Sequence, residues 1–184
     1  MSARPRTKPK RTSSPKAPIV VAIDVMVDSP LWNAHRGIKA LLRRTIAAAA
    51  AMASTTDGEL AIVLTDDSAI RALNRRWRGR DEPTNVLSFP ASVRPIPAKA
   101  AKRKKPPHLF GDIVIAYETT AREAQAQHKP LRDHLAHLAV HGFLHLLGYD
   151  HEGEEQAAAM EALEIAVLAR LDVPDPYIAR DAKR

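Results

Sequence analysis

Apolar residues along the chain fall into short β-branched runs and longer stretches with helical spacing. The short runs predict strands at residues 18–27, 59–64, 84–89 and 111–117, each bounded by proline, glycine or acidic residues. The longer stretches predict helices at residues 33–53, 67–77, 119–128, 130–147 and 154–171. The order β-α-β-α-β-β-α-α-α indicates an α+β fold, a single domain in which about five helices pack on a small mixed four-stranded sheet.

The composition narrows the class of protein. The 184 residues, 45% of them hydrophobic, suit one domain with a sizeable core. No apolar run reaches the ~18 residues that a membrane span needs, and the first residues lack the apolar stretch of a secretory signal. We therefore expect a cytoplasmic protein with no membrane partner. Because the chain has no cysteine, a bound metal would have to rest on histidine and carboxylate ligands.

The net charge of +7 is unevenly distributed. Residues 1–17 and 94–105 each carry six lysines and arginines and no acid, and since these twelve charges exceed +7 by five, the rest of the chain nets −5. Proline and lysine with few apolar residues are typical of disorder. We predict a basic disordered N-terminal extension at 1–17 and a domain at 18–180 with a basic insert at 93–107. Either segment could bind nucleic acid through phosphates or serve only to keep the protein soluble.

The segment from His141 to His151 contains three histidines in the pattern H-x3-H-x2-G-x2-H. On a helix, His141 and His145 lie on one face about 5–6 Å apart. Gly148 can end that helix in a left-handed conformation, so that the reversed chain brings His151 back to the same point. We predict that His141, His145 and His151 bind one zinc ion per chain and leave a fourth position open.

The spacing matches the long zincin motif with one departure. Gly142 stands where the proteases of that class have the glutamate that acts as general base. Its absence argues against peptide hydrolysis but not against hydrolysis as such, because zinc lowers the pKa of bound water to about 7. The glycine is also expected to leave space beside the metal for a bulky substrate.

Other polar residues lie close to this motif in the sequence. His134 and His137 share the helical stripe of His141, and since zinc needs only three ligands here, we interpret them as structural residues or as partners of the ligands. Asp150 is expected to orient the turn or to accept a hydrogen bond from a histidine, with a helix N-cap as the alternative. The loop from Arg75 to Pro83 holds four arginines, which either form a solvated surface or bind phosphate.

Taken together, the motifs resemble those of the YbeY endoribonuclease family, also called rRNA maturation factors. The resemblance rests on His141–His151 and extends over roughly residues 19–180. Its other blocks are Leu73-Asn74 with Arg78, then 83–90 (PTNVLSFP), 111–115 (GDIVI) and 175–178 (DPYI). Residues 1–17 and the lysine-rich insert depart from the compact family pattern.

The resemblance implies a bacterial cytoplasmic, zinc-dependent, single-strand-specific endoribonuclease. It implies a role in 16S rRNA 3′-end maturation and ribosome quality control, with single-stranded RNA, the 16S rRNA precursor and the ribosome or small-subunit proteins as partners, and no DNA. The metal ligands would be His141, His145 and His151, and the catalytic arginine would be Arg78, which stabilises the negative charge that develops during phosphodiester cleavage. The sequence identifies neither the general base nor the attacking group, water or the ribose 2′-hydroxyl.

Two other functions stay open. One is a metallohydrolase of another substrate class, against which the missing glutamate and the basic segments count. The other is a non-catalytic RNA-binding ribosome-assembly factor with structural zinc.

Overall fold

The computed structural model describes residues 19–91, 108–151 and 153–178, so the extension at 1–17 and the insert at 93–107 lie outside the described residues. The strands are β1 (Val21–Val27), β2 (Gly58–Thr65), β3 (Val86–Pro90) and β4 (His108–Ala116). The α-helices are α1 (Ile38–Met52), α2 (Asp67–Arg78), α3 (Tyr117–Ala126), α4 (Leu131–Leu146) and α5 (Glu154–Ala169). The predicted α+β class with one small sheet is confirmed.

The sheet has the strand order β1-β2-β4-β3. β1 pairs with β2 and β2 with β4 in parallel, whereas the edge strand β3 runs antiparallel to β4. The central strand β2 is therefore hydrogen-bonded on both sides, with Ile62 level with Val25 on one neighbour and Ile113 on the other. All three side chains are buried, as expected for the middle of a mixed sheet that helices cover.

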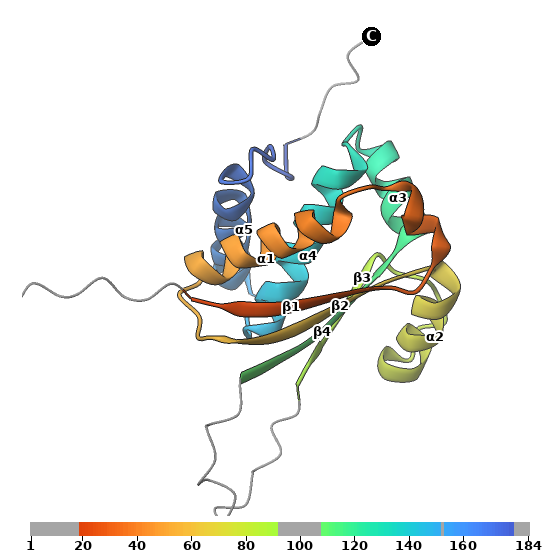
Figure 1. Ribbon diagram of the computed structural model, residues 1–184, viewed down its shortest axis with the longest axis horizontal. Helices are drawn as coiled ribbons and strands as arrows, with labels where there is room; N and C mark the ends of the chain where they lie inside the picture. Colours follow the sequence, from red (N-terminus) through yellow and green to blue (C-terminus); the bar gives the residue numbers. More distant parts are fainter. Residues whose placement is uncertain (1–18, 92–107, 152, 179–184) are drawn as a thin grey trace, which may run out of the picture.

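Helices α1, α4 and α5 lie on one face of the sheet and α2 lies on the other (Figure 1). Successive side chains of a strand point to opposite faces of the sheet, so alternate residues of each strand contribute to the packing on each face. Ile62 and Ile113 belong to the large core under α1, α4 and α5, together with the fully buried Phe143 of α4. Val114 belongs to a smaller core with Ile70 of α2. The histidine motif on α4 is thus held against the larger core.

Several predicted element bounds differ from the structure. The helix predicted at 33–53 is divided into a 3-10 turn, Pro30–Ala34, and α1, which begins at Ile38 after Gly37 adopts a φ of 79°. The turn forms because Trp32 is buried and its indole N–H donates to the carbonyl oxygen of Thr65 at 2.8 Å. Long-range burial of this kind leaves no periodic signal in the sequence.

The starts of α2 and α3 lie at or near their predicted positions. α2 begins at Asp67 as predicted, and its first turn is capped by the side chain of Asp66, which accepts from the backbone N–H of Ala69 at 2.9 Å. The carboxylate of Asp67 accepts from the backbone N–H of Thr119 at 3.0 Å and so connects α2 to α3. α3 begins directly after β4, two residues before the predicted start.

In the described part of the chain, no helix is both long enough and apolar enough to cross a membrane.

Candidate metal centre

The end of α4 places the three histidines of the motif together. α4 begins after Pro130 and stops at Leu146, and Gly148 then takes a φ of 87°. The reversal is closed by the backbone N–H of Tyr149, which donates to the carbonyl oxygen of Leu144 at 3.1 Å. A glycine in the left-handed conformation is the usual way to end a helix and reverse the chain, so the predicted turn is confirmed.

His141, His145 and His151 each offer a ring nitrogen, and these atoms all lie within 4.8 Å of one another. The Nε2 atoms of His141 and His145 are 3.1 Å apart. Two nitrogens that bind one tetrahedral zinc at 2.0–2.1 Å are about 3.3–3.4 Å apart, so the observed separation is close to what one ion requires. The three predicted ligands are therefore brought into one cluster.

The other ring nitrogens fix the tautomers of two of these histidines. His141 donates from Nδ1 to Oε1 of Glu164 at 2.8 Å, and His145 donates from Nδ1 to the carbonyl oxygen of Tyr149 at 3.0 Å. In the neutral rings both Nε2 atoms then carry lone pairs that face each other, and this arrangement repels unless a cation lies between them. Metal-binding histidines are typically oriented by such acceptors.

The surroundings of His145 favour its neutral form. Burial lowers the pKa of His145, and the nearby His141 and His151 lower it further. A neutral imidazole is the form that binds a metal, so this one ligand stays in its metal-binding form at lower pH than a free histidine would. Three imidazole ligands suit a divalent transition metal.

A buried carboxylate that the sequence reasoning missed supports the cluster. Glu164 of α5 is fully buried and accepts hydrogen bonds from His141, from Nε2 of His137 at 3.1 Å and from the hydroxyl of Tyr177. Burial on its own raises the pKa of Glu164, but the hydrogen bonds from His137, His141 and Tyr177 outweigh it and lower the pKa to about 2. Burial and the bond to Glu164 raise the pKa of Tyr177. The available signal was a charged residue on the stripe of α5 that also carries Met160.

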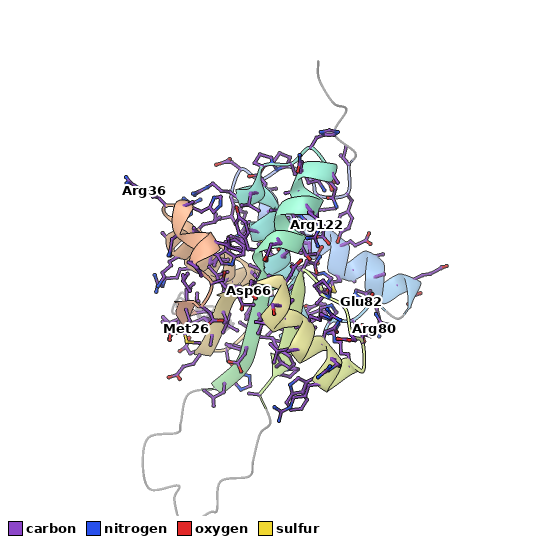
Figure 2. All side chains as sticks on the ribbon, turned by 90° about the vertical axis from the view of Figure 1, so that its right-hand side faces the viewer. Met26, Arg36, Asp66, Arg80, Glu82 and Arg122 are labelled. Atoms are coloured by element: carbon purple, nitrogen blue, oxygen red, sulfur yellow. The ribbon has the colours of Figure 1, made fainter. Side chains whose placement is uncertain are left out.

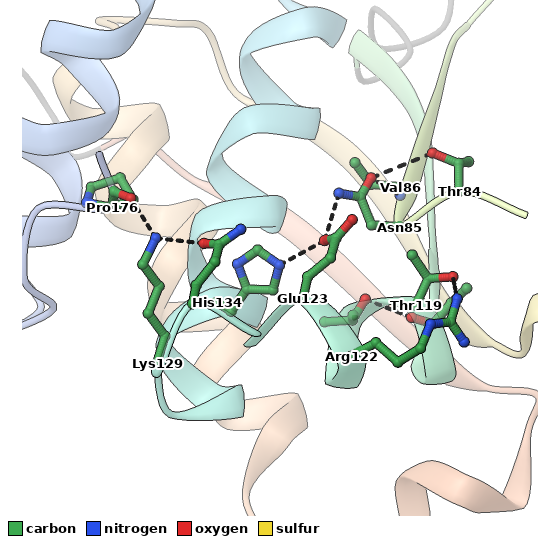
Figure 3. A network of polar contacts seen from close by, with 12 residues as sticks. Thr84, Asn85, Val86, Thr119, Arg122, Glu123, Lys129, His134 and Pro176 are labelled. Carbon is green, nitrogen blue, oxygen red and sulfur yellow. Dashed lines mark hydrogen bonds and ion pairs between the residues drawn. The ribbon is translucent and has the colours of Figure 1, made fainter. Parts of the chain in front are cut away.

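His134 and His137 bind carboxylates and do not belong to the ligand cluster. Figure 3 shows His134 donating from Nε2 to Glu123 at 2.8 Å, and Glu123 also accepting from the side-chain amide of Asn85 at 2.9 Å. Burial raises the pKa of Glu123, but these two bonds outweigh it and the pKa is lowered. The interpretation of both histidines as structural residues or ligand partners agrees with these contacts.

Gly142 faces the sheet. A Cβ atom at this position would lie 3.0 Å from Oγ of Ser88 and 3.1 Å from Cγ2 of Ile113. The Ser88 hydroxyl also donates to the carbonyl oxygen of Gly142 at 2.9 Å. Glycine therefore lets α4 pack closely on β3 and β4. The expectation that it leaves space for substrate is wrong, because the sheet fills that space.

Asp150 orients the turn. Its Oδ1 accepts from the backbone N–H of His151 at 2.7 Å and lies 3.8 Å from the Nδ1 of the same residue. The alternative role as a helix N-cap is wrong, since Gly153 precedes the first turn of α5.

A cavity of about 420 Å³ opens beside the cluster. Its wall includes His141 and His151 from the cluster, with His137, Glu164 and Tyr177 beside them. A substrate in this cavity would contact two of the three candidate ligands. Arg78 is the exposed last residue of α2 and is not among the described residues that line the cavity, so its catalytic role stays a prediction.

Comparisons with known proteins agree with the motif. Residues 30–172 match the family model described as Endoribonuclease YbeY. A relative from Nitrobacter hamburgensis named Endoribonuclease YbeY is 51% identical over 166 residues, which cover 89% of this chain and 86% of the relative. Another of that name from Rhodopseudomonas palustris (strain BisA53) is 53% identical over 162 residues, 87% of this chain and 92% of the relative. The solution structure of TM1509 from Thermotoga maritima is 21% identical with a TM-score of 0.49, and the match covers 88% of this chain and 99% of that one. The chain, matched over most of its length by both the family model and these relatives, belongs to the endoribonuclease YbeY family.

Proposed function

We propose that the protein is a zinc-dependent, single-strand-specific endoribonuclease of the bacterial cytoplasm, acting in 16S rRNA 3′-end maturation and ribosome quality control. The observation that carries the proposal is the cluster of His141, His145 and His151, in a chain of this family. Three imidazoles with an adjoining cavity are typical of a catalytic zinc site, which keeps one position open for substrate or water.

A zinc ion held by these histidines would supply a Lewis acid for a phosphate oxygen and would lower the pKa of water. The protein's own part is to hold the ligands. Glu164 keeps a proton on Nδ1 of His141, and the Tyr149 carbonyl oxygen keeps one on Nδ1 of His145, so that both Nε2 atoms present lone pairs. Gly142 supplies no base, because it carries no side chain and faces the sheet.

We assign Arg78 to the negative charge that builds on the phosphate during cleavage. A guanidinium presents a planar fork that matches phosphate oxygens, and it stays charged at all working pH values. Arg78 is exposed at the end of α2 and makes no ion pair within the described ranges, so its guanidinium is available to a ligand. The domain boundaries 1–17 and 18–180, with the insert at 93–107, and the partnership with the ribosome or small-subunit proteins belong to the same proposal.

A cleavage assay tests the function. Zinc-loaded protein should cut single-stranded RNA internally, chelated protein should not, and added zinc should restore the activity. His145→Ala should be inactive at any zinc concentration, because one of three ligands is missing. Retained zinc with no cleavage of any single-stranded RNA would instead indicate an assembly factor with structural zinc. Cleavage of peptide but not RNA would indicate another class of metallohydrolase.

A further inference from the structure

The two tryptophans of the chain have opposite environments. Trp32 is 1% exposed and belongs to the core, whereas Trp77, in the last turn of α2, is 62% exposed. Trp77 does touch the sheet, since its ring lies 6.0 Å from that of Phe89 in an edge-to-face arrangement. That contact leaves most of the indole in solvent, so packing against β3 does not account for a side chain of this size.

Arginines flank Trp77 in the sequence. Arg75, Arg76 and Arg78 share the last turn of α2, and Arg80 follows in the loop. Residues 71–82 contain five arginines and two acids, a net charge of +3, in a chain whose remainder outside the two basic segments is acidic. Figure 2 shows Arg80 and Glu82 beside α2, after the chain has turned back.

Most of these guanidinium groups are not engaged by the protein. Arg71 forms a two-pronged ion pair with Asp81, at 2.9 and 3.0 Å. The side chains of Arg76, Arg78 and Arg80 make no hydrogen bond or ion pair within residues 19–91, 108–151 and 153–178. Arg76 instead lies over the indole of Trp77, with its Cζ 5.3 Å from the ring centroid.

We propose that Trp77 is a stacking platform for an unpaired base of single-stranded RNA, and that Arg76 and Arg80 bind the phosphates on either side of that base. The proposal rests on the proposed function in that RNA is taken as the ligand, and it adds a binding site on α2 outside the cavity beside the histidines. Proteins hold single-stranded nucleic acid through aromatic rings that stack on bases and cations that follow the backbone, and the end of α2 offers both.

The same features disfavour other ligands. A duplex keeps its bases stacked on one another and offers none to an exposed indole, so the site is selective for single strands. A protein partner that buried Trp77 would have to leave the three free guanidinium groups unpaired or match each with an acid. RNA can cover the indole with a base and supply negative charge to the guanidinium groups with the phosphates next to that base.

Three variants of the full-length, zinc-loaded protein test the proposal. Trp77→Leu keeps an apolar side chain but loses the ring, and Trp77→Phe keeps a ring. Met26→Ala removes an exposed apolar side chain of β1, which lies away from Arg80 in Figure 2, and is the matched control. Affinity is measured with a short single-stranded 2′-O-methyl oligonucleotide that is checked for integrity afterwards, and with a copy in which the bases are replaced by abasic sites.

Trp77→Leu should weaken binding to the normal oligonucleotide roughly 5- to 100-fold, the range for loss of one base–aromatic stack. Trp77→Phe should lose less, and Met26→Ala should bind like the wild type. On the abasic oligonucleotide the wild type and Trp77→Leu should bind equally. Binding should also quench the fluorescence of the exposed tryptophan, and the quenching should vanish in Trp77→Phe, where only the buried Trp32 remains.

Equal affinity of the wild type and both Trp77 variants for the normal oligonucleotide would overturn the proposal, as would quenching that persists in Trp77→Phe. A Trp77→Leu protein that fails to fold leaves Trp77→Phe and the abasic oligonucleotide to decide. Quenching of Trp77 fluorescence without RNA cleavage would reject the nuclease function and support the stacking site. Cleavage of RNA with no effect of either Trp77 substitution would support the nuclease function and reject the stacking site.

Discussion

Replacing Glu164 by glutamine should weaken metal binding without removing a ligand. Gln has the same size, but its NH₂ group is a donor and so opposes at least one of the three donors that Glu164 now accepts, from His141, His137 and Tyr177. If the donor of His141 is opposed, its ring loses the acceptor that fixes Nε2 toward the ion.

Loss of such a partner typically costs 10- to 100-fold in metal affinity, or about 1.4–2.8 kcal/mol. The structure places Glu164 toward the upper end of that range, because the side chain is fully buried and water cannot take over the hydrogen bond from His141.

Zinc affinity of Glu164→Gln is measured by competition with a chromophoric chelator at pH 7. Glu123→Gln is the matched control, since Glu123 also accepts from a histidine of α4, His134, that lies outside the ligand cluster. Glu123→Gln should bind zinc as tightly as the wild type. Wild-type affinity in Glu164→Gln, or an equal loss in both variants, would refute a specific role for Glu164 in orienting His141.

Arg78→Ala should cut single-stranded RNA about 10²- to 10³-fold more slowly with its zinc content unchanged, whereas His145→Ala should lose both activity and zinc; loss of zinc from Arg78→Ala would make that arginine structural. Metal-free protein should lose stability as the pH falls from about 4.5 towards 2. The reason is that the pKa of Glu164 is lower in the folded protein than in the unfolded chain, so the unfolded chain binds a proton first. Acid unfolding of Glu164→Gln should lack this loss of stability. RNA binding should weaken when residues 1–17 are deleted or when the basic residues 102–105 are changed to serine. The slope of log affinity against log salt concentration should then fall by about 0.7 for each phosphate that the protein no longer neutralises, while the rate at saturating RNA stays the same. An unchanged slope would mean that these segments only keep the protein soluble.

The sequence carried most of the information about the histidine cluster. Two candidate ligands four residues apart on a helix and a glycine that reverses the chain are local features, so the positions of His141, His145 and Gly148 can be predicted without knowledge of the fold. His151 followed from the length of the turn. Local patterns also predicted each strand and α-helix of the described residues, with bounds that differ by a few residues where side chains from distant segments intervene.

The residues that the sequence did not reveal depend on contacts between distant segments. Glu164 meets His141 across 23 positions, and Tyr177 reaches Glu164 from the segment after α5, so neither contact has a local pattern. Gly142 follows the predicted ligand His141 in the sequence, which suggests space for a substrate, yet its own position on α4 faces Ser88 and the sheet. The packing of the layers decides whether a helical residue faces the sheet, another helix or the solvent. Spacing in the sequence alone does not define this.

The three-histidine metal centre is tested most directly by elemental analysis of protein purified without added metal, alongside His151→Ala. The wild type should contain one zinc per chain and His151→Ala much less, because His151 is the ligand that the turn after α4 brings to the other two. Fewer than about 0.3 zinc per wild-type chain, with no other transition metal in its place, or full occupancy in His151→Ala, would contradict the assignment of this cluster as the metal site.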